Sequence, residues 1–374
     1  MDYVIIGGGV YGCGVAWELA RRGAEVLLLE ANQIASGASG GLGKRGVRAN
    51  GRDLRELPLM ALAYDRWLYL HQELDGPTGY DRDGHLLLIE REQDRIAAPA
   101  QAWMQVQQGV PSEIIEEDAL HEMEPYLSEQ VVSAIYCPND GVSDHTLTTR
   151  TFAEAARRFG ADVREETRLH ELKRQGDRIT GIVTDKEEHI PVDKTLILLA
   201  NSHVPVLLQK YFNLTLPIWQ ILPQVLLTEP VTPMPVEHLI GHAHRTLAMK
   251  AHTTSSSEQV MISGGWRGRW NPATGRGETQ PDQIAGNLAE AVAVYPMLED
   301  LKVWQADAGR LETVTVDGIP IIDRVAGVDN LFYATGWSGH GWAISPVVTR
   351  LLADWVWEGD RPELLAPFGY ERFR

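Results

Sequence analysis

The chain has 374 residues, a formal net charge of −17, and 44% hydrophobic against 23% charged residues. Because a single hydrophobic core stops growing near ~250–300 residues, we expect two connected domains. The acidic balance, without any Lys/Arg run, argues against nucleic acid and anionic membrane surfaces as partners, since both require a basic patch.

The N-terminus begins with a pattern typical of a βαβ unit of about 30 residues. Asp2–Gly7 is an apolar run that ends in glycines and predicts a buried parallel strand. Gly12–Gly23 has helical spacing and a glycine stop, and Glu25–Glu30 predicts the second buried strand. The unit is followed by a loop of small residues, Ala35–Gly43.

The next stretch alternates between predicted helices and strands. Helices are expected over 54–74, from 91 to about 108, and over 146–159, and strands over 85–90 and 131–136. Asp162–Glu166 and Arg178–Asp185 are predicted as hairpin partners, and Thr195–Ala200 as a buried strand that rejoins the first sheet.

The remainder is β-rich over 216–270, helical over 282–299, and ends in a buried strand at 330–335 and a helix at 344–357. We therefore predict an α/β fold with an α+β second domain. A discontinuous Rossmann-like cofactor domain would comprise 1–80, 140–215 and 305–374. A substrate domain on a mixed or antiparallel β-sheet would comprise 81–139 and 216–304.

Gly7, Gly9 and Gly12 form a Gly-x-Gly-x-x-Gly motif between the first strand and the first helix. Such glycines allow a tight turn, close approach of the backbone to a pyrophosphate, and close packing of helix on strand. Glu30, 18 residues beyond Gly12, can accept hydrogen bonds from a ribose 2′-OH and would repel the 2′-phosphate of NADP. The motif predicts a dinucleotide site.

Two further glycine-rich segments indicate FAD rather than NAD. The loop Ala35–Gly41 follows the acidic strand end, where an extended FAD needs a second clamp. The turn Gly336–Gly341 lies between a strand and a helix and would form a second anion-binding helix N-terminus, suited to the reduced flavin. A flexible linker and a plain helix cap are the respective structural alternatives.

On these motifs the chain resembles the FAD-dependent D-amino-acid-oxidase-like superfamily. The likeness lies in GGGVYGCGVAWELARRGAEVLLLE, ASGASG, TVDGIPIID and NLFYATGWSGHGWAISP. LANSHVPVLLQ, VMISGGWRG and LLAPFGYERF are most similar to the beta subunit of heterotetrameric sarcosine oxidase and to dye-linked proline dehydrogenase subunits. The resemblance covers nearly the whole chain.

The resemblance implies hydride transfer from an amine or amino acid to flavin N5, leaving an imine that hydrolyses, with O₂ or an electron carrier as acceptor. The alternatives are a beta-type subunit that acts mainly in electron transfer within a hetero-oligomer, and an NAD-dependent dehydrogenase. A homo-oligomer is equally compatible with the sequence. The substrate stays open among sarcosine-, proline- and glycine-like molecules.

Arg48 aligns with the arginine that grips the substrate carboxylate in relatives, a role that suits a guanidinium fork. Lys44 and Arg45 align near the flavin face, and His340 lies in the flavin-side turn. Lys250 and Trp266 would roof the substrate. The alternatives are a surface or structural ion pair for Arg48, solvated charges for Lys44 and Arg45, and a packing role for His340. Where glycine oxidases carry a carboxylate-binding arginine, this chain has Glu312, which shifts that role onto Arg48.

The resemblance also bears on flavin attachment. The chain lacks a C-terminal cysteine, and Gly41 replaces the histidine of histidine-linked relatives, so we predict non-covalent FAD. His145 aligns with a histidine that carries FMN in heterotetrameric sarcosine oxidase, and an ordinary loop histidine is the alternative. The predicted FAD-contacting residues are Gly7, Gly9, Val10, Tyr11, Gly12, Glu30, Ala31, Ser36, Gly37, Ser39, Gly40, Leu169, Ala200, Asn201, Gly309, Gly336, Trp337, Gly339, His340, Gly341, Trp342 and Ala343.

Cys13 and Cys137 are the only cysteines, too few for a disulfide framework or for metal spacing, so we predict no metal site and a reducing compartment. No stretch is apolar for long enough to span a bilayer, and no signal peptide is recognisable. We therefore expect a cytoplasmic protein.

Overall fold

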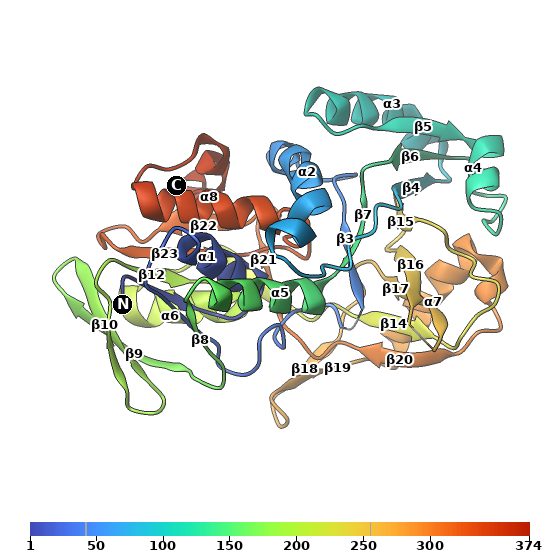
Figure 1. The fold of residues 1–374 in the computed structure, drawn as a ribbon. Coiled ribbons are helices and arrows are strands. Elements are labelled where there is room, and N and C mark those ends of the chain that lie inside the picture. The colour runs from blue at the N-terminus through green and yellow to red at the C-terminus, as the bar shows by residue number, and fades with distance from the viewer. Residues whose placement is uncertain (42, 255) are drawn as a thin grey trace.

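The computed structural model describes residues 1–41, 43–254 and 256–374. Leu42, within the predicted small-residue loop, lies outside the described residues. The described strands form two main sheets, at the left and right of Figure 1, joined by strands that run between them. The α/β fold with a β-rich second part is confirmed.

The first sheet has six strands among the described residues, in the order β22-β23-β12-β1-β2-β8. β1, β2, β12 and β23 are buried along their whole length, as expected for parallel strands covered on both faces. β1 lies parallel between β12 and β2, with Ile5 opposite Ile197 and Leu28. The bounds are β1 Tyr3–Ile6, β2 Val26–Leu29, β8 Asp162–Arg164, β12 Thr195–Leu198, β22 Ile321–Arg324 and β23 Leu331–Thr335.

Alternate residues of β1 enter two different cores because successive side chains of a strand point to opposite faces. Ile5 packs in a core with the helices α1, α2, α5 and α8. Val4 and Ile6 pack on the other face against α6 and the three-stranded sheet β11-β10-β9. The bounds are α1 Val10–Ala20, α2 Leu57–Glu73, α5 His145–Arg158, α6 Val204–Phe212, α8 Ser345–Glu358, β9 Leu169–Gln175, β10 Arg178–Thr184 and β11 His189–Pro191.

The second sheet has eight strands in the described part, in the order β20-β14-β17-β16-β15-β4-β6-β5. β15 and β4 pair in parallel and their neighbours pair antiparallel, so the sheet is mixed. The bounds are β4 His85–Ile89, β5 Glu113–Glu116, β6 Ser133–Cys137, β14 Val225–Thr228, β15 Leu239–His242, β16 Ala248–Thr253, β17 Glu258–Ser263, β20 Val303–Asp307, α3 Glu92–Gln107, α4 Glu117–Met123 and α7 Pro281–Val294.

Short antiparallel pairs lie outside the two main sheets of the described residues. β3 pairs with β7, β13 with β21, and β18 with β19. Four 3₁₀ turns complete the described elements. The bounds are β3 Lys44–Val47, β7 Gly141–Asp144, β13 Ile218–Ile221, β18 Arg269–Asn271, β19 Arg276–Glu278, β21 Glu312–Thr315, η1 Asn201–His203, η2 Pro296–Leu298, η3 Glu363–Phe368 and η4 Tyr370–Phe373.

The predicted hairpin between 162–166 and 178–185 is wrong. β8 instead extends the first sheet parallel to β2, and β10 pairs with β9. Gln175 lies opposite Arg178, so Gly176 and Asp177 form a two-residue turn, and Gly176 has the positive φ of +63° that such turns require. The Gly176–Asp177 turn joins β10 to β9, a strand that the sequence analysis left unassigned.

Strands of the first sheet come from 1–80, 140–215 and 305–374, the ranges proposed for the cofactor domain. β20 begins at Val303 in the second sheet, and β13 pairs with β21 across a proposed boundary. The two-domain division therefore stays a proposal.

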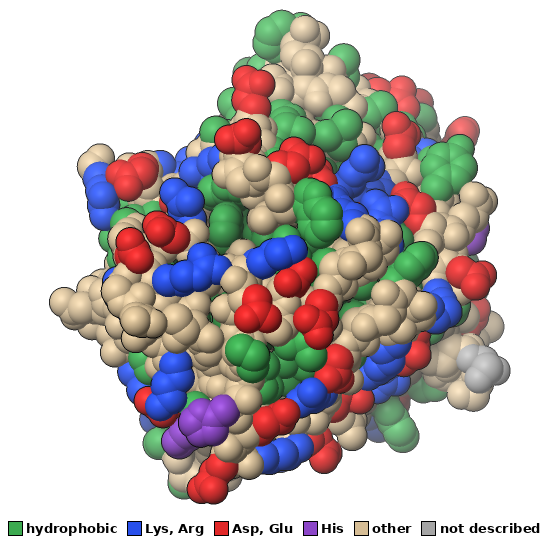
Figure 2. All heavy atoms as spheres, turned by 60° about the vertical axis from the view of Figure 1, so that its left-hand side comes forward, with side chains coloured by type: hydrophobic (Ala, Val, Ile, Leu, Met, Phe, Trp, Pro, Cys, Tyr) green, Lys and Arg blue, Asp and Glu red, His purple; other side chains and the backbone are tan. Residues whose placement is uncertain are grey.

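No helix of the described residues is long and apolar enough to cross a bilayer. Figure 2 shows a face on which basic and acidic side chains are interspersed.

Candidate functional site

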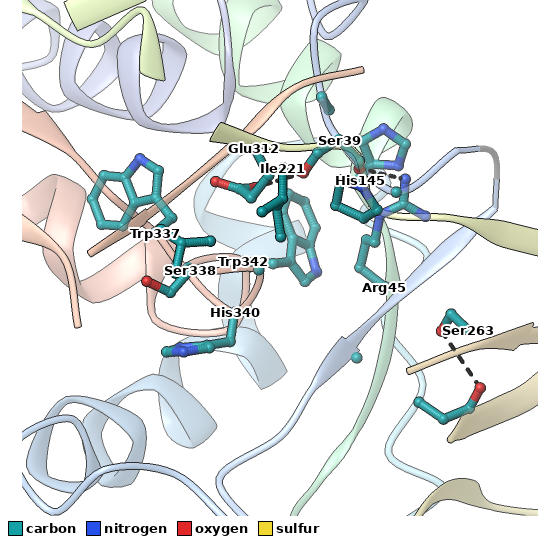
Figure 3. Close-up of a pocket in the computed structure, with 18 of the residues that line it drawn as sticks. Ser39, Arg45, His145, Ile221, Ser263, Glu312, Trp337, Ser338, His340 and Trp342 are labelled. Atoms are coloured by element: carbon teal, nitrogen blue, oxygen red, sulfur yellow. Dashed lines mark hydrogen bonds between the residues drawn. The ribbon is translucent and has the colours of Figure 1, made fainter. Parts of the chain in front are cut away.

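A cavity of about 1170 Å³ extends from the first βαβ unit to the second sheet. It is larger than the roughly 300–1,000 Å³ of ordinary small-molecule pockets, so it has room for an extended cofactor together with a substrate. Its lining comes from both ends of the chain and from the β-rich middle. Figure 3 shows part of this lining.

The glycine motif forms the nucleotide end of the cavity. Gly7 has a φ of +116°, and Gly7 and Gly9 both line the cavity. α1 begins at Val10, two residues before the predicted start at Gly12, because Gly9 is its N-cap. Gly9 makes no side-chain capping bond, so the first-turn amides of α1 are available to phosphate oxygens.

Gly12 serves packing rather than contact with a ligand. A Cβ at Gly12 would lie 1.8 Å from the carbonyl oxygen of Gly7, so no other residue allows α1 to approach β1 this closely. Cys13, next to it, is fully buried, as expected for a structural residue.

Glu30 lies at the end of β2 and lines the same end of the cavity. Its carboxylate accepts the backbone N–H of Gly8 at 2.7 Å and that of Asn32 at 2.8 Å. These bonds fix the carboxylate beside the glycine turn, and each oxygen keeps a lone pair for a ribose hydroxyl.

The two ends of the chain meet at this cavity. The Tyr11 hydroxyl donates to the carbonyl oxygen of Gly341. The rings of Tyr11 and Trp337 stack with centroids 3.6 Å apart and planes 6° apart. Gly336 and Gly339 have positive φ angles, as tight turns require, but α8 begins only at Ser345, so this turn precedes the helix instead of forming its first turn.

Glu312 joins the small-residue loop to the middle of the chain. Its carboxylate accepts the Ser39 hydroxyl at 2.5 Å and the Asn201 side-chain amide at 3.1 Å. Burial raises the pKa of Glu312, and these donors partly offset that rise. Figure 3 shows Ser39 and Glu312 side by side. Glu312 thus braces the small-residue loop against the middle of the chain.

Several basic residues line the cavity, and three of them were predicted from the sequence to lie near the flavin or the substrate. Arg45 and Arg48 are half-buried and Lys250 is buried, and all three line the cavity. Burial lowers the pKa of Arg45 to about 10 and that of Lys250 to about 7, and it also lowers the pKa of Arg48. Burial penalises charge, so the cavity favours an anionic ligand here.

Arg48 has few protein partners. Its Nη1 donates to the carbonyl oxygen of Asn50 at 2.6 Å, and within the described residues no carboxylate lies at ion-pair distance. Arg45 instead donates to loop carbonyl oxygens, including those of Ser39 at 3.1 Å and Gly43 at 3.3 Å. Arg45 therefore holds the loop, and Arg48 retains donors for a ligand.

His145, at the start of α5, lines the cavity beside Arg45, as Figure 3 shows. Its ring lies edge-on to Trp342 with centroids 6.2 Å apart, and Nδ1 lies 3.3 Å from the Gly43 carbonyl oxygen. Burial and the neighbouring Arg45 lower the pKa of His145 to about 4, so the ring is neutral at pH 7.

An ion-pair network that the sequence analysis missed supports His340. Its Nδ1 lies 3.1 Å from a Glu56 carboxylate oxygen and 3.3 Å from Nη1 of Arg52. Arg52 and Glu56 are themselves 3.3 Å apart, four residues apart in sequence. The four-residue spacing of Arg52 and Glu56 is visible in the sequence. However, such pairs are common on solvated helix faces, so the spacing does not by itself indicate a functional site.

Most predicted site residues lie on the cavity, and some do not. Lys44 pairs with Asp81 away from it, and the Trp266 indole donates to the Thr246 carbonyl oxygen at 2.9 Å. Gly12, Ser36, Gly309, Gly336 and Ala343 are also absent from the lining. The predicted residues that line the cavity are Gly7, Gly9, Val10, Tyr11, Glu30, Ala31, Gly37, Ser39, Gly40, Arg45, Arg48, His145, Leu169, Ala200, Asn201, Lys250, Trp337, Gly339, His340, Gly341 and Trp342.

Glu90, His242 and His244 place potential metal-ligand atoms within 4.8 Å of one another. However, the Nδ1 atom of His242 accepts the amide N–H groups of His244 and Arg245, both at 3.3 Å. A neutral ring that accepts at Nδ1 carries its proton on Nε2, the atom that faces Glu90 at 3.6 Å. Arg245 also pairs with Glu90, so this geometry favours an ion-pair cluster.

The nucleotide end of this site fits FAD. The uncapped first turn of α1 suits a pyrophosphate, and the fixed carboxylate of Glu30 suits a ribose. The loop at 35–41 and the turn at 336–341 lie along the same cavity, as an extended dinucleotide requires.

Comparisons with known proteins agree with this geometry. The chain aligns over 381 residues with a sarcosine oxidase subunit beta from Arthrobacter sp, at 24% identity, covering all of this chain and 91% of that protein. It is 24% identical over 393 residues to the bifunctional protein ThiO/ThiG of Nostoc sp., but there it spans only 55% of that relative's length.

Among solved structures, L-proline dehydrogenase from P. horikoshii has a similar fold, with a TM-score of 0.88 and 23% identity over all of this chain and 97% of that one. Glycine oxidase from Geobacillus kaustophilus follows with a TM-score of 0.84 and 21% identity, over 99% of this chain and 98% of that one. Residues 2–355 match the FAD dependent oxidoreductase family, and the chain belongs to this family, as an enzyme with FAD as its cofactor.

Proposed function

We propose that this enzyme oxidises the carbon–nitrogen bond of an amino acid, with a secondary amino acid resembling sarcosine or proline as the preferred substrate. The names of the relatives, a sarcosine oxidase subunit and a proline dehydrogenase, support this substrate class. When bound, FAD supplies the acceptor for the hydrogen removed from the carbon next to nitrogen.

The position of Arg48 in the cavity is the observation that supports an amino acid, and not a simple amine, as the substrate. It lies in the cavity with one backbone partner and without a carboxylate at ion-pair distance among the described residues. A guanidinium fork binds a carboxylate through two parallel hydrogen bonds. In this proposal Arg48 binds the substrate carboxylate, and so fixes the position of the adjacent amine within the cavity.

The FAD contacts predicted from the sequence belong to the same proposal. Glu30 and the turn at 7–12 would hold the nucleotide, and the loop braced by Glu312 would lie against the flavin. The attachment is proposed to be non-covalent. O₂ and an electron carrier both remain candidates for the final acceptor.

A second candidate function is that of a beta-type subunit within a larger complex. Two observations favour it: the subunit status of the Arthrobacter relative, and the position of His145 on the cavity beside Arg45 and Trp342. An FMN at His145 would need a partner subunit to complete its site. Co-purification of a stoichiometric partner with a second flavin supports this candidate, and full activity of the chain alone contradicts it.

The test of the main proposal is anaerobic reduction of the purified yellow protein. Sarcosine and proline should bleach the flavin. Dimethylamine and pyrrolidine, which lack only the carboxylate, serve as matched controls. Losing a buried charge-assisted pair costs roughly 2–5 kcal/mol, so the controls should be about 30-fold to several-thousand-fold less efficient. If no amino acid reduces the flavin, the proposed function is wrong.

A further inference from the structure

His85, the first residue of β4, lies between the cavity and a buried carboxylate. The ring is 2% exposed, and its Nδ1 has no hydrogen-bond partner among the described residues. Nδ1 lies 3.8 Å from a carboxylate oxygen of Asp140. A buried imidazole with an unpartnered nitrogen is costly, which indicates a role beyond packing.

Gly241 shows which way the other ring nitrogen points. A Cβ at Gly241 would lie 2.8 Å from Nε2 of His85, and Gly241 itself lines the cavity. Its backbone does not require glycine, because its φ is not in the left-handed region. The missing side chain therefore makes room for the imidazole, with Nε2 toward the cavity and Nδ1 toward Asp140.

Asp140 is fully buried and rigidly held. Its carboxylate accepts the backbone N–H of Ala49 at 2.7 Å, that of Asn50 at 3.1 Å, and the Tyr64 hydroxyl at 2.6 Å. Burial outweighs these donors and raises the pKa of Asp140 to about 6. Asp140 can therefore hold a proton more readily than an ordinary aspartate.

The chemistry of the proposed function creates a need for such a group. An amine donates its α-hydrogen only when the nitrogen lone pair is free, and an alkylammonium has a pKa of about 10. At pH 7 roughly one molecule in a thousand carries that lone pair. The cations Arg45 and Arg48 cannot accept the proton.

We propose that His85 and Asp140 form a proton relay that deprotonates the ammonium group of a substrate held at Arg48, an inference that rests on the proposed function. Nε2 of His85 takes the proton from the substrate nitrogen while the bond to the α-hydrogen breaks, and Nδ1 passes its own proton to the Asp140 carboxylate in the same step. The α-hydrogen leaves with its electron pair to the acceptor that bound FAD would supply, and the forming C=N bond drives the proton transfer. The products are an iminium, a neutral imidazole and a carboxylic acid, so protons, electrons and charge balance. His85 is the catalytic residue, because it touches the substrate, and Asp140 acts through it.

The 3.8 Å separation must shorten by about 1 Å for this transfer. Catalytic hydrogen bonds are often long without substrate and tighten in the complex. Burial and Arg48 keep the pKa of His85 well below its usual value, so the ring is neutral, and Nε2 can accept a proton only while Nδ1 gives its own to Asp140. A substrate carboxylate bound to Arg48 would offset the positive charge of Arg48, and so would weaken its lowering effect on the pKa of His85.

Most of the other titratable groups around His85 do not compete for the proton near neutral pH. Cys137 lies opposite His85 in the β4–β6 ladder, and burial raises its pKa. Burial also raises the pKa of Tyr64, which packs on Asp140 from α2. Arg48 and Arg52 contribute positive charge from the segment after β3. Lys250, with its pKa lowered to about 7, is the one rival acceptor.

The test is the pH dependence of flavin reduction by sarcosine or proline in anaerobic stopped flow. With the relay, the wild-type rate of flavin reduction reaches a plateau above about pH 7. At lower pH the rate falls, because Asp140 becomes protonated. Without a relay, the rate climbs tenfold per pH unit toward pH 10. That climb in the wild-type enzyme overturns the proposal without any variant.

Two variants sharpen the test. His85→Gln should lower the rate by about 10²–10³-fold at pH 7 and restore the tenfold climb, since only the neutral amine then reacts. Asp140→Asn should behave likewise. His189→Gln, at an exposed position of β11, is the matched control and should keep the wild-type profile. Flavin absorbance and thermal melting report whether each variant folds.

The outcomes separate the two claims. A wild-type enzyme that no amino acid reduces at any pH refutes both. A wild-type enzyme that is reduced, with His85→Gln keeping the plateau and a rate within threefold, leaves the proposed function standing and overturns the relay. If the plateau is lost in Lys250→Met but kept in His85→Gln, Lys250 is the residue that accepts the proton. That result also overturns the relay.

Discussion

The nucleotide end and the second sheet line the same cavity by different means. Around Gly7 and Gly9 the lining includes backbone amide groups, and Gly7 has a positive φ. On the second sheet the lining is side chains, including His85, Lys250 and His242. In the proposed function, peptide groups would hold the cofactor, whereas the substrate side of the cavity would depend on individual charged residues.

This contrast predicts that geometry decides the effect of mutation at the nucleotide end. Gly12→Ala should give the largest effect, because its Cβ would lie 1.8 Å from a backbone oxygen that cannot move aside. We expect little folded protein and no bound FAD, measured by flavin absorbance and yield. Gly23→Ala, at the other end of α1, meets open space, and its positive φ costs only about 1–2 kcal/mol. Equal FAD content in the two variants would contradict the contrast.

On the side of the cavity formed by the second sheet, we expect charge to decide the effect of a mutation. The pKa of Lys250 is lowered to about 7, so an anion beside the ammonium raises that pKa and binding takes up a proton. The affinity of the holoenzyme for acetate should therefore be greatest below pH 7 and fall by up to tenfold per pH unit above it. In Lys250→Met this slope should vanish. A spectral titration at several pH values measures it, and an unchanged slope in the variant would exclude Lys250.

The smallest effect is expected at Lys44, a sequence-predicted site residue that lies off the cavity. Its ammonium pairs with Asp81, and both side chains are substantially exposed. Exposed ion pairs contribute roughly 0–1 kcal/mol. Lys44→Met should leave flavin content unchanged and substrate turnover within twofold of wild type, as steady-state assays can check. A tenfold loss of turnover would return Lys44 to the site.

The sequence was most informative where local patterns determine structure. The βαβ unit, the buried strands and α2, α3, α5 and α8 follow from apolar periodicity and glycine stops. The pairing of β10 was predicted wrongly because the Gly176–Asp177 turn was overlooked. The role of Glu312 in bracing Ser39 and the approach of His85 to Asp140 depend on contacts 273 and 55 residues apart, which a single sequence does not encode locally.

The central claim is that Arg48 holds the carboxylate of the substrate while other residues hold FAD. Anaerobic titration with sarcosine or proline, followed by flavin absorbance, compares wild type, Arg48→Ala and Arg48→Lys directly. We predict an unaltered flavin spectrum and a substrate affinity lowered by about 30-fold to several-thousand-fold in Arg48→Ala, corresponding to roughly 2–5 kcal/mol. Arg48→Lys should lie between, since it keeps the charge without the fork. An affinity within threefold of wild type in Arg48→Ala would contradict the claim.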